Sequence, residues 1–163
     1  LEVLKKLLND EIKARSKTNL VESKTLMEML ENSIRRYHNK IVSAVEVIDE
    51  LISLSKEIKE MDKLPKELGL TEYEYAFYTA IASNNSAMEL MGKDKLRELA
   101  VALYEQIKSN ASIDWTIKES VKSKLKVAVK RTLRKYGYPP DMQKLATDTV
   151  LQQAEMIAEE LSA

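Results

Sequence analysis

The stretch IDWTIKESVKSKLKVAVKRTLRKYGYPPD, from Ile113 to Asp141, contains one strongly basic segment followed by a glycine and two prolines. Between Lys118 and Lys135 it carries eight Lys or Arg and one acid, a net charge of +7, whereas the whole chain has 26 basic and 26 acidic residues. Apolar residues recur every three or four positions, which predicts an amphipathic helix over about 116–137. One basic helix is therefore the first place to look for a contact with an anionic partner.

The end of this helix is marked by residues with special backbone preferences. Gly137 can adopt the left-handed conformation that ends a helix, and proline cannot continue one. We expect Tyr138, Pro139 and Pro140 to form a rigid elbow that fixes the angle to the last helix. Either Asp141 or the proline opens that helix.

The composition of the rest of the chain predicts an all-α protein. Three Gly and three Pro in 163 residues are too few for the turns of a β protein, and 44% hydrophobic residues suffice for a core. The lack of cysteine excludes disulfides and thiolate chemistry. No apolar run reaches the roughly 18 residues of a membrane span, and no signal-peptide pattern opens the chain. We expect a cytoplasmic protein that makes no membrane contact, and a chain that is a piece of a longer one.

Helical periodicity continues along nearly the whole sequence and predicts a single irregular bundle of about seven helices. A possible subdivision separates 1–62 from 71–163 at a break marked by Pro65 and Gly69, and a polar segment, 84–94, holds at most a short helical turn. Ser43 is a predicted N-cap, and Thr71 with Glu74 forms a predicted capping box. The expected helices cover about 1–15, 20–39, 44–62, 71–83, 95–107, 116–137 and 141–161.

The apolar stripes predict which side chains face the core. These inward positions are Leu1, Leu4, Leu8, Ile12, Met27, Leu30, Ile34, Tyr37, Val45, Ile48, Leu51, Ile52, Ile58, Tyr73, Phe77, Met88, Met91, Leu96, Leu99, Ala100, Leu103, Ile107, Leu145, Val150, Ala154, Ile157 and Leu161.

A helical wheel of the basic segment separates its charge from its apolar side at roughly 100° per residue. The apolar side comprises Ile117, Val121, Leu125, Ala128, Val129, Thr132 and Tyr136. Lys126, Lys130 and Arg134 stack on the other side, and Lys124 and Arg131 extend the row. Such a face suits a phosphate backbone or an acidic protein surface. The alternative is a solvated face that pairs with acids of the same chain.

Other residues suggest structural roles rather than chemistry. Trp115 is expected to pack against the core where the basic helix begins, with an exposed aromatic platform as the alternative. Lys135 falls beside Ile117 on the wheel and has to snorkel outward. The three glycines are far apart and precede no G-K-S or G-K-T, so no phosphate-binding loop is expected. His38 is the sole histidine, and we expect neither catalytic residues nor a metal site.

Several segments resemble a known family. They are LGLTEYEYAFYTAIA at 68–82, IDW at 113–115 and LRKYGYPPD at 133–141, with DEIKARSKTNLVESKTLMEMLENSIRRYHNK at 10–40, VIDELISLSKEIKE at 47–60 and VLQQAE at 150–155. Together they resemble the C-terminal helical region of the R subunit of type I restriction enzymes. The structural motif that carries most of this resemblance is Trp115, Gly137, Tyr138, Pro139, Pro140 and Asp141.

The resemblance implies a part of an ATP-dependent type I site-specific deoxyribonuclease. Such a subunit has a nuclease domain and two motor domains upstream, so ATP and Mg²⁺ are expected for the full-length subunit and no cofactor for this segment. The segment itself is expected to dock the subunit onto the modification and specificity subunits, the methyltransferase core. Non-specific contact with double-stranded DNA through Lys124, Lys126, Lys130, Arg131 and Arg134 is a further expectation.

Two other functional classes remain open from the residues alone. The first is a stand-alone helical adaptor for protein interaction, unrelated to restriction. The second is a basic helix that lies on a membrane surface, but its apolar residues Val121, Leu125 and Val129 are needed for the core. An autonomous enzyme is disfavoured because no cluster of polar side chains recurs at catalytic spacing.

Overall fold

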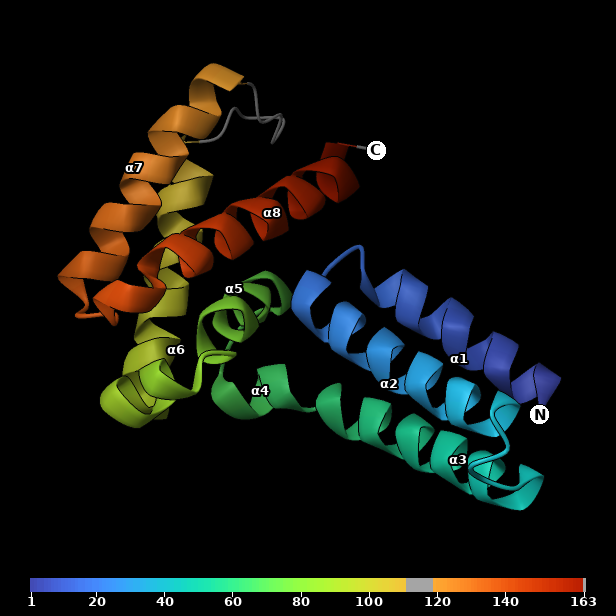
Figure 1. Ribbon diagram of the computed structural model, residues 1–163. Coiled ribbons are helices and arrows are strands. Elements are labelled where there is room, and N and C mark those ends of the chain that lie inside the picture. The colour runs from blue at the N-terminus through green and yellow to red at the C-terminus, as the bar shows by residue number, and fades with distance from the viewer. Residues whose placement is uncertain (111–118, 163) are drawn as a thin grey trace.

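The computed structural model describes residues 1–110 and 119–162 and, for 119 and 160–162, the backbone alone. These described residues form helices connected by short turns, with no strand among them (Figure 1). The helices are α1 Glu2–Arg15, α2 Leu20–His38, α3 Ala44–Met61, α4 Leu64–Leu68, α5 Glu72–Ala82, α6 Asn85–Asn110, α7 Glu119–Lys135, the 3₁₀ helix η1 Pro140–Met142 and α8 Gln143–Ser162. The predicted all-α bundle of about seven helices is confirmed.

The buried side chains form two hydrophobic clusters, one in each half of the chain. Helices α1, α2 and α3 lie side by side and enclose the first, which we call the core of the N-terminal lobe (Figure 1). Helices α4 to α8 enclose the second, the core of the C-terminal lobe. The two buried clusters do not merge. Val21 of α2 packs against the second cluster, and the polar contacts described below also join the lobes. Whether 1–62 and 71–163 act as separate domains stays a prediction.

Caps predicted from the sequence set two of the helix boundaries. The Ser43 side chain accepts a hydrogen bond from the backbone N–H of Glu46, as predicted for an N-cap. At α5 the Thr71 side chain accepts from the backbone N–H of Glu74, and the Glu74 carboxylate accepts from the backbone N–H of Thr71. This reciprocal pair is the predicted capping box.

The expected break at 63–70 is not a loop throughout. It contains the five-residue helix α4, which has Pro65 in its first turn and ends at Gly69 with φ of 69°. Proline tolerates the first turn of a helix because the backbone N–H it lacks has no partner there. The polar segment 84–94 is also more helical than expected, since α6 begins at Asn85 and is interrupted only at Gly92, where φ is 78°.

Of the predicted inward positions, fourteen are buried, eight are half-buried and four are exposed, and the side chain of Leu161 lies outside the described residues. The α6 stripe of Leu96, Leu99, Ala100, Leu103 and Ile107 is fully buried, as predicted. Exposed instead are Val45 (70%), Ile52 (42%), Met88 (37%) and Leu145 (60%).

These errors have two geometric causes. The true inward stripe of α3 is Val47, Leu51, Leu54 and Ile58, and Val45 and Ile52 lie roughly 150° and 130° away from its centre. Leu145 and Met88 each neighbour a buried alanine, Ala146 and Ala87, which takes the inward position. The small alanine allows close helix packing, and the larger residue next to it then faces outward.

Candidate functional site

The inward face of α7 fixes which side of the helix carries the charge. Leu125, Val129 and Leu133 are 1%, 0% and 0% exposed and belong to the core of the C-terminal lobe. The wheel read from the sequence included the first two and omitted Leu133. Buried side chains at spacings of four anchor α7 along its length, so the opposite side is held toward solvent.

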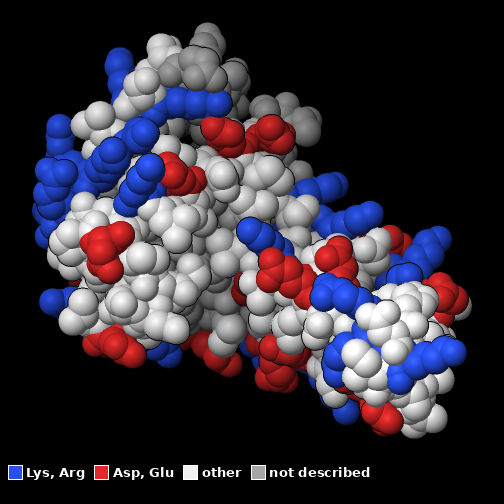
Figure 2. Space-filling model, in the orientation of Figure 1, with Lys and Arg blue, Asp and Glu red and all other residues white. Residues whose placement is uncertain are grey.

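The cations on that opposite side form the basic face of α7. Lys124, Lys126, Arg131 and Arg134 are exposed and Lys130 is half-buried. In Figure 2 lysine and arginine side chains gather along the α7 edge of the molecule, with few acids between them. None of these five residues forms an ion pair within the described chain. The basic face is therefore not neutralised by the protein's own described acids.

One cation of α7 behaves differently, and two further residues belong to the exposed side. Lys122 is turned toward α8, where its ammonium lies 3.0 Å from a carboxylate oxygen of Glu155. Lys135 is exposed, as the expected outward snorkelling requires. Val127, 55% exposed, lies between Arg134 and Arg131 on the wheel, so the basic face has an apolar centre that the sequence reading missed.

The elbow after α7 has the geometry that its sequence predicted. Gly137 has φ of 76°, its backbone N–H donates to the carbonyl of Arg134, and the N–H of Tyr138 donates to the carbonyl of Leu133. This pair of bonds is a Schellman motif, which requires a left-handed residue at its glycine. Tyr138 is 2% exposed and its hydroxyl donates to the carbonyl of Ile81 at 2.8 Å. The elbow is thus tied to the end of α5.

The remaining family-motif residues continue this turn. Pro139 is buried, whereas Pro140 and Asp141 are exposed in η1. The restart is therefore a 3₁₀ turn, and α8 begins at Gln143 rather than at Asp141. Trp115 and Ile117 lie outside the described residues, as does the predicted start of the basic helix near Thr116.

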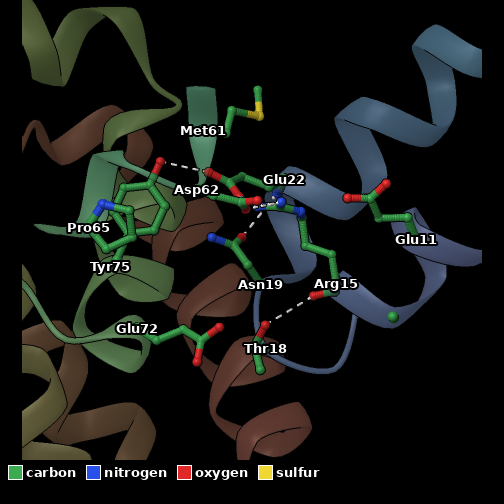
Figure 3. Close-up of a pocket in the computed structure, with 11 residues that line it drawn as sticks. Glu11, Arg15, Thr18, Asn19, Glu22, Met61, Asp62, Pro65, Glu72 and Tyr75 are labelled. Atoms are coloured by element: carbon green, nitrogen blue, oxygen red, sulfur yellow. Dashed lines mark hydrogen bonds and ion pairs between the residues drawn. The ribbon is translucent and has the colours of Figure 1, made fainter. Parts of the chain in front are cut away.

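A second polar cluster lies where the two lobes meet, and we call it the lobe junction (Figure 3). Glu22 of α2 is 7% exposed and accepts a 2.6 Å hydrogen bond from the hydroxyl of Tyr75 on α5. Its other oxygen pairs with the guanidinium of Arg15 at 2.9 Å, and Arg15 also pairs with Asp62. Burial, with the bond to Glu22, raises the pKa of Tyr75 above its usual range. One buried carboxylate therefore links α1, α2 and α5.

Two buried amides complete the lobe junction. The side-chain oxygen of Asn19 accepts from the backbone N–H of Glu22 at 3.0 Å and from the hydroxyl of Thr79 at 3.1 Å. Gln153 of α8, 0% exposed, accepts from the backbone N–H of Leu20 at 2.7 Å and donates to the carbonyl of Thr18 at 3.1 Å. The sequence reading assigned no role to these residues. The Asn19–Glu22 spacing of an N-cap was the available signal.

The lobe junction opens into a cavity of about 330 Å³. Glu11, Arg15, Asn19 and Glu22 line it from the N-terminal lobe and Glu72 from α5. The carboxylates outnumber the single guanidinium, and that guanidinium already pairs with Glu22 and Asp62. The cavity is therefore acidic, in contrast to the basic face of α7.

Comparison with known proteins places these features in a family. The family described as type I restriction enzyme HindI endonuclease subunit-like, C-terminal, matches residues 1–160. The chain belongs to this family. The type I restriction enzyme HindI endonuclease subunit of Haemophilus influenzae is 41% identical over 162 residues, which is 99% of this chain. A putative type I restriction enzyme MjaIXP endonuclease subunit of Methanocaldococcus jannaschii is 34% identical over 137 residues, or 83% of the chain.

These relatives of the HindI-like family are far longer than the chain itself. The matched part is 15% of the first relative and 13% of the second. No solved structure matches the chain. Across the described residues, none of the helices has the length and apolar character needed to cross a bilayer.

Proposed function

We propose that this domain docks a type I restriction endonuclease subunit onto its methyltransferase core, made of modification and specificity subunits, through the basic face of α7. Auxiliary, non-specific contact with double-stranded DNA through the same face is part of the proposal. One observation carries it: five cations on one exposed helix face lack ion pairs within the described chain, although the chain as a whole is neutral. Family membership supplies the class of complex.

The physical argument rests on what unpaired surface charge does. A group of like charges on one rigid helix is unfavourable for the isolated domain, since neighbours at i and i+4 repel each other. Complementary acids or phosphates relieve that repulsion, and the field steers the partner into one orientation. The exposed Val127 in the middle of the face favours a protein surface as the main partner, because a phosphate backbone offers it no apolar contact.

We expect neither ATP nor Mg²⁺ to bind this segment. Each glycine ends or interrupts a helix, and none lies in a loop that could cradle phosphates. On this proposal both cofactors bind parts of the subunit outside this chain. On the same proposal this segment acts by binding alone.

The proposal is tested with a charge-reversal variant and a matched control. The variant replaces Lys126, Lys130 and Arg134 by Glu. The control reverses three exposed lysines of the N-terminal lobe, Lys24, Lys56 and Lys59, and so changes the net charge by the same amount. Co-purification with the modification and specificity subunits is expected to be lost in the variant and kept in the control. Equal capture of the two proteins would refute docking through α7.

DNA contact is measured separately in a salt series with non-specific duplex DNA. Five engaged phosphates predict a slope of about −4.5 in log K against log salt. The α7 variant is expected to make that slope shallower by about 3, and the control is expected to leave it unchanged. Absence of binding at low salt would remove the DNA contact from the proposal and leave subunit docking to be judged by co-purification.

A further inference from the structure

The lobe junction contains a buried hydrogen-bond donor without an acceptor. Asn19 is 4% exposed, and its side-chain oxygen is used twice, by Glu22 and Thr79. Its amide nitrogen Nδ2 has no hydrogen-bond partner. In Figure 3 this nitrogen points to the side of Tyr75 and Glu72, away from Arg15. A buried donor left unpaired costs about 1–3 kcal/mol, so the site is suited to an incoming acceptor oxygen.

The carboxylates around this donor favour a ligand group with positive charge. Both oxygens of Glu22 are taken, one by Tyr75 and one by Arg15. The carboxylates of Glu11 and Glu72 lie at the rim, exposed, and form no ion pair. Three net negative charges therefore surround the cavity once the Arg15 charge is counted. An anionic ligand is repelled there, and a cationic group is attracted.

A ligand that satisfies the site must carry both a cation and an acceptor oxygen. A metal ion offers no acceptor to Asn19, and among the described residues no cluster of three or more His, Cys, Asp or Glu could hold one. A basic residue within a polypeptide has both groups, since its main-chain carbonyl accepts while its side chain carries the charge. The cavity of about 330 Å³ is at the small end of ligand sites, large enough for one such side chain.

We propose that the lobe junction binds an arginine or lysine of a partner polypeptide. The basic side chain lies between Glu72 and Glu11, and the main-chain carbonyl of the same segment accepts a hydrogen bond from Asn19 Nδ2. This contact uses residues of α1, α2 and α5 and none of α7. It is therefore independent of the basic face and goes beyond the docking function proposed for it.

The test uses the 163-residue chain and a defined peptide. Acetyl-Gly-Arg-Gly-amide is titrated at low salt while the ¹H–¹⁵N signals of the protein are recorded. We expect saturable shifts of the Asn19 side-chain amide and of the backbone of Glu72 and Tyr75. The same peptide with citrulline in place of arginine is the control, because citrulline keeps the shape and loses the charge. Equal shifts with both peptides, or an unmoved Asn19 side-chain signal at saturation, would overturn the proposal.

Two variants separate the rim charge from the buried amide. Glu72→Gln changes an exposed side chain, and we expect peptide affinity to fall about tenfold. Glu89→Gln, on an exposed position of α6, is its matched control and should leave affinity unchanged. Asn19→Ser keeps a capping oxygen for α2 and removes the Nδ2 donor. The thermal midpoint of the Asn19→Ser variant is measured first. If this variant is unfolded, the comparison of Glu72→Gln with Glu89→Gln decides the outcome.

A last comparison distinguishes this site from the basic face. Charge reversal at Lys126, Lys130 and Arg134 should leave the peptide shifts intact while abolishing co-purification with the methyltransferase subunits. Conversely, Glu72→Gln should leave the DNA salt slope unchanged. Loss of peptide binding in the α7 variant would contradict the assignment of the peptide to the lobe junction.

Discussion

The lobe junction and the basic face of α7 differ in whether their cations form ion pairs. At the lobe junction Arg15 is 15% exposed and pairs with Glu22 and Asp62, and in the N-terminal lobe Arg36 lies 2.6 Å from both carboxylate oxygens of Glu50. The hydrogen bonds from Arg36 lower the pKa of Glu50. On the basic face of α7 the five cations form no ion pair within the described chain, and all of them except the half-buried Lys130 are exposed. Burial with a partner makes a charge structural, whereas exposure without one leaves it available for binding.

The sharpest way to break this comparison is to remove Arg15. Arg15→Met keeps the aliphatic stem and leaves the carboxylate of Glu22 buried without its cation. We expect the free energy of unfolding to fall by about 3 kcal/mol, since deleting one partner of a buried pair strands the other charge. Urea denaturation followed by circular dichroism measures it.

The double variant Arg15→Met/Glu22→Gln is the control for this mechanism. Glutamine retains an oxygen for the hydroxyl of Tyr75 and carries no charge. The double variant is therefore expected to be more stable than the single Arg15→Met variant by about 1–2 kcal/mol. Strict additivity of the two changes would show that Arg15 contributes through packing and not through charge.

The lobe junction also predicts alkaline sensitivity. Burial and the bond to Glu22 raise the pKa of Tyr75. Its hydroxyl therefore stays protonated in the folded state at pH values at which it is ionised in the unfolded chain. The stabilisation is fully present below the unfolded pKa of about 10 and is lost as pH rises toward the folded pKa. We expect the free energy of unfolding to fall by about 1.4 kcal/mol per pH unit above pH 10 on account of Tyr75.

Tyr75→Phe isolates this contribution from other groups that titrate in the same range. Burial also raises the pKa values of Tyr78, Tyr104 and Tyr138, all in the C-terminal lobe. The variant should therefore keep a decline with pH, but one shallower by about 1.4 kcal/mol per unit. Urea midpoints at pH 9, 10 and 11 give both slopes, and identical slopes would contradict the role of Tyr75.

The sequence predicted the burial of apolar side chains well and missed the burial of polar ones. The stripe Leu96, Leu99, Leu103 and Ile107 repeats at helical spacing, so its burial is a local property and was predicted correctly. The Glu22–Tyr75 bond joins residues 53 positions apart, and a single polar residue in a helical pattern normally indicates surface. No local signal separates a buried glutamate from an exposed one. The tertiary pairing of helices decides it.

At the candidate site, the sequence predicted which cations are exposed but not which cation forms an ion pair. That the five cations of the basic face lie opposite the apolar stripe of α7 follows from periodicity alone, and the sequence placed Lys126 and Arg131 correctly on the exposed side. That Lys122 pairs with Glu155 depends on how α8 crosses α7, which periodicity does not contain. The turn at Gly137 was predictable because a left-handed glycine before Tyr-Pro-Pro leaves the backbone few other conformations.

A smaller effect is expected at the elbow that positions α7. Gly137 has φ of 76°, and a Cβ added there meets no atom within 4 Å, so alanine meets a backbone penalty and no clash. Gly137→Ala should lower the free energy of unfolding by about 1 kcal/mol, and Gly137→Asn by less, because asparagine tolerates the left-handed region better. Urea denaturation ranks the three proteins. Equal stability of the alanine and asparagine variants would indicate that the turn rearranges.

The smallest stability effect is predicted for the face proposed to bind. Replacing Lys126, Lys130 and Arg134 by Gln removes the two like-charge pairs at i, i+4 among these residues and a third with Lys122, whose charge is already offset by Glu155. Each such pair destabilises an isolated helix by about 0.2–0.5 kcal/mol. The free energy of unfolding should therefore stay the same or rise by less than about 1 kcal/mol, while co-purification with the methyltransferase subunits is lost. A fall in stability by as much as the Arg15 variant would mean that these cations are structural after all, and the contrast between the two regions would disappear. A stable variant without binding is the pattern that separates a recognition charge from a structural one.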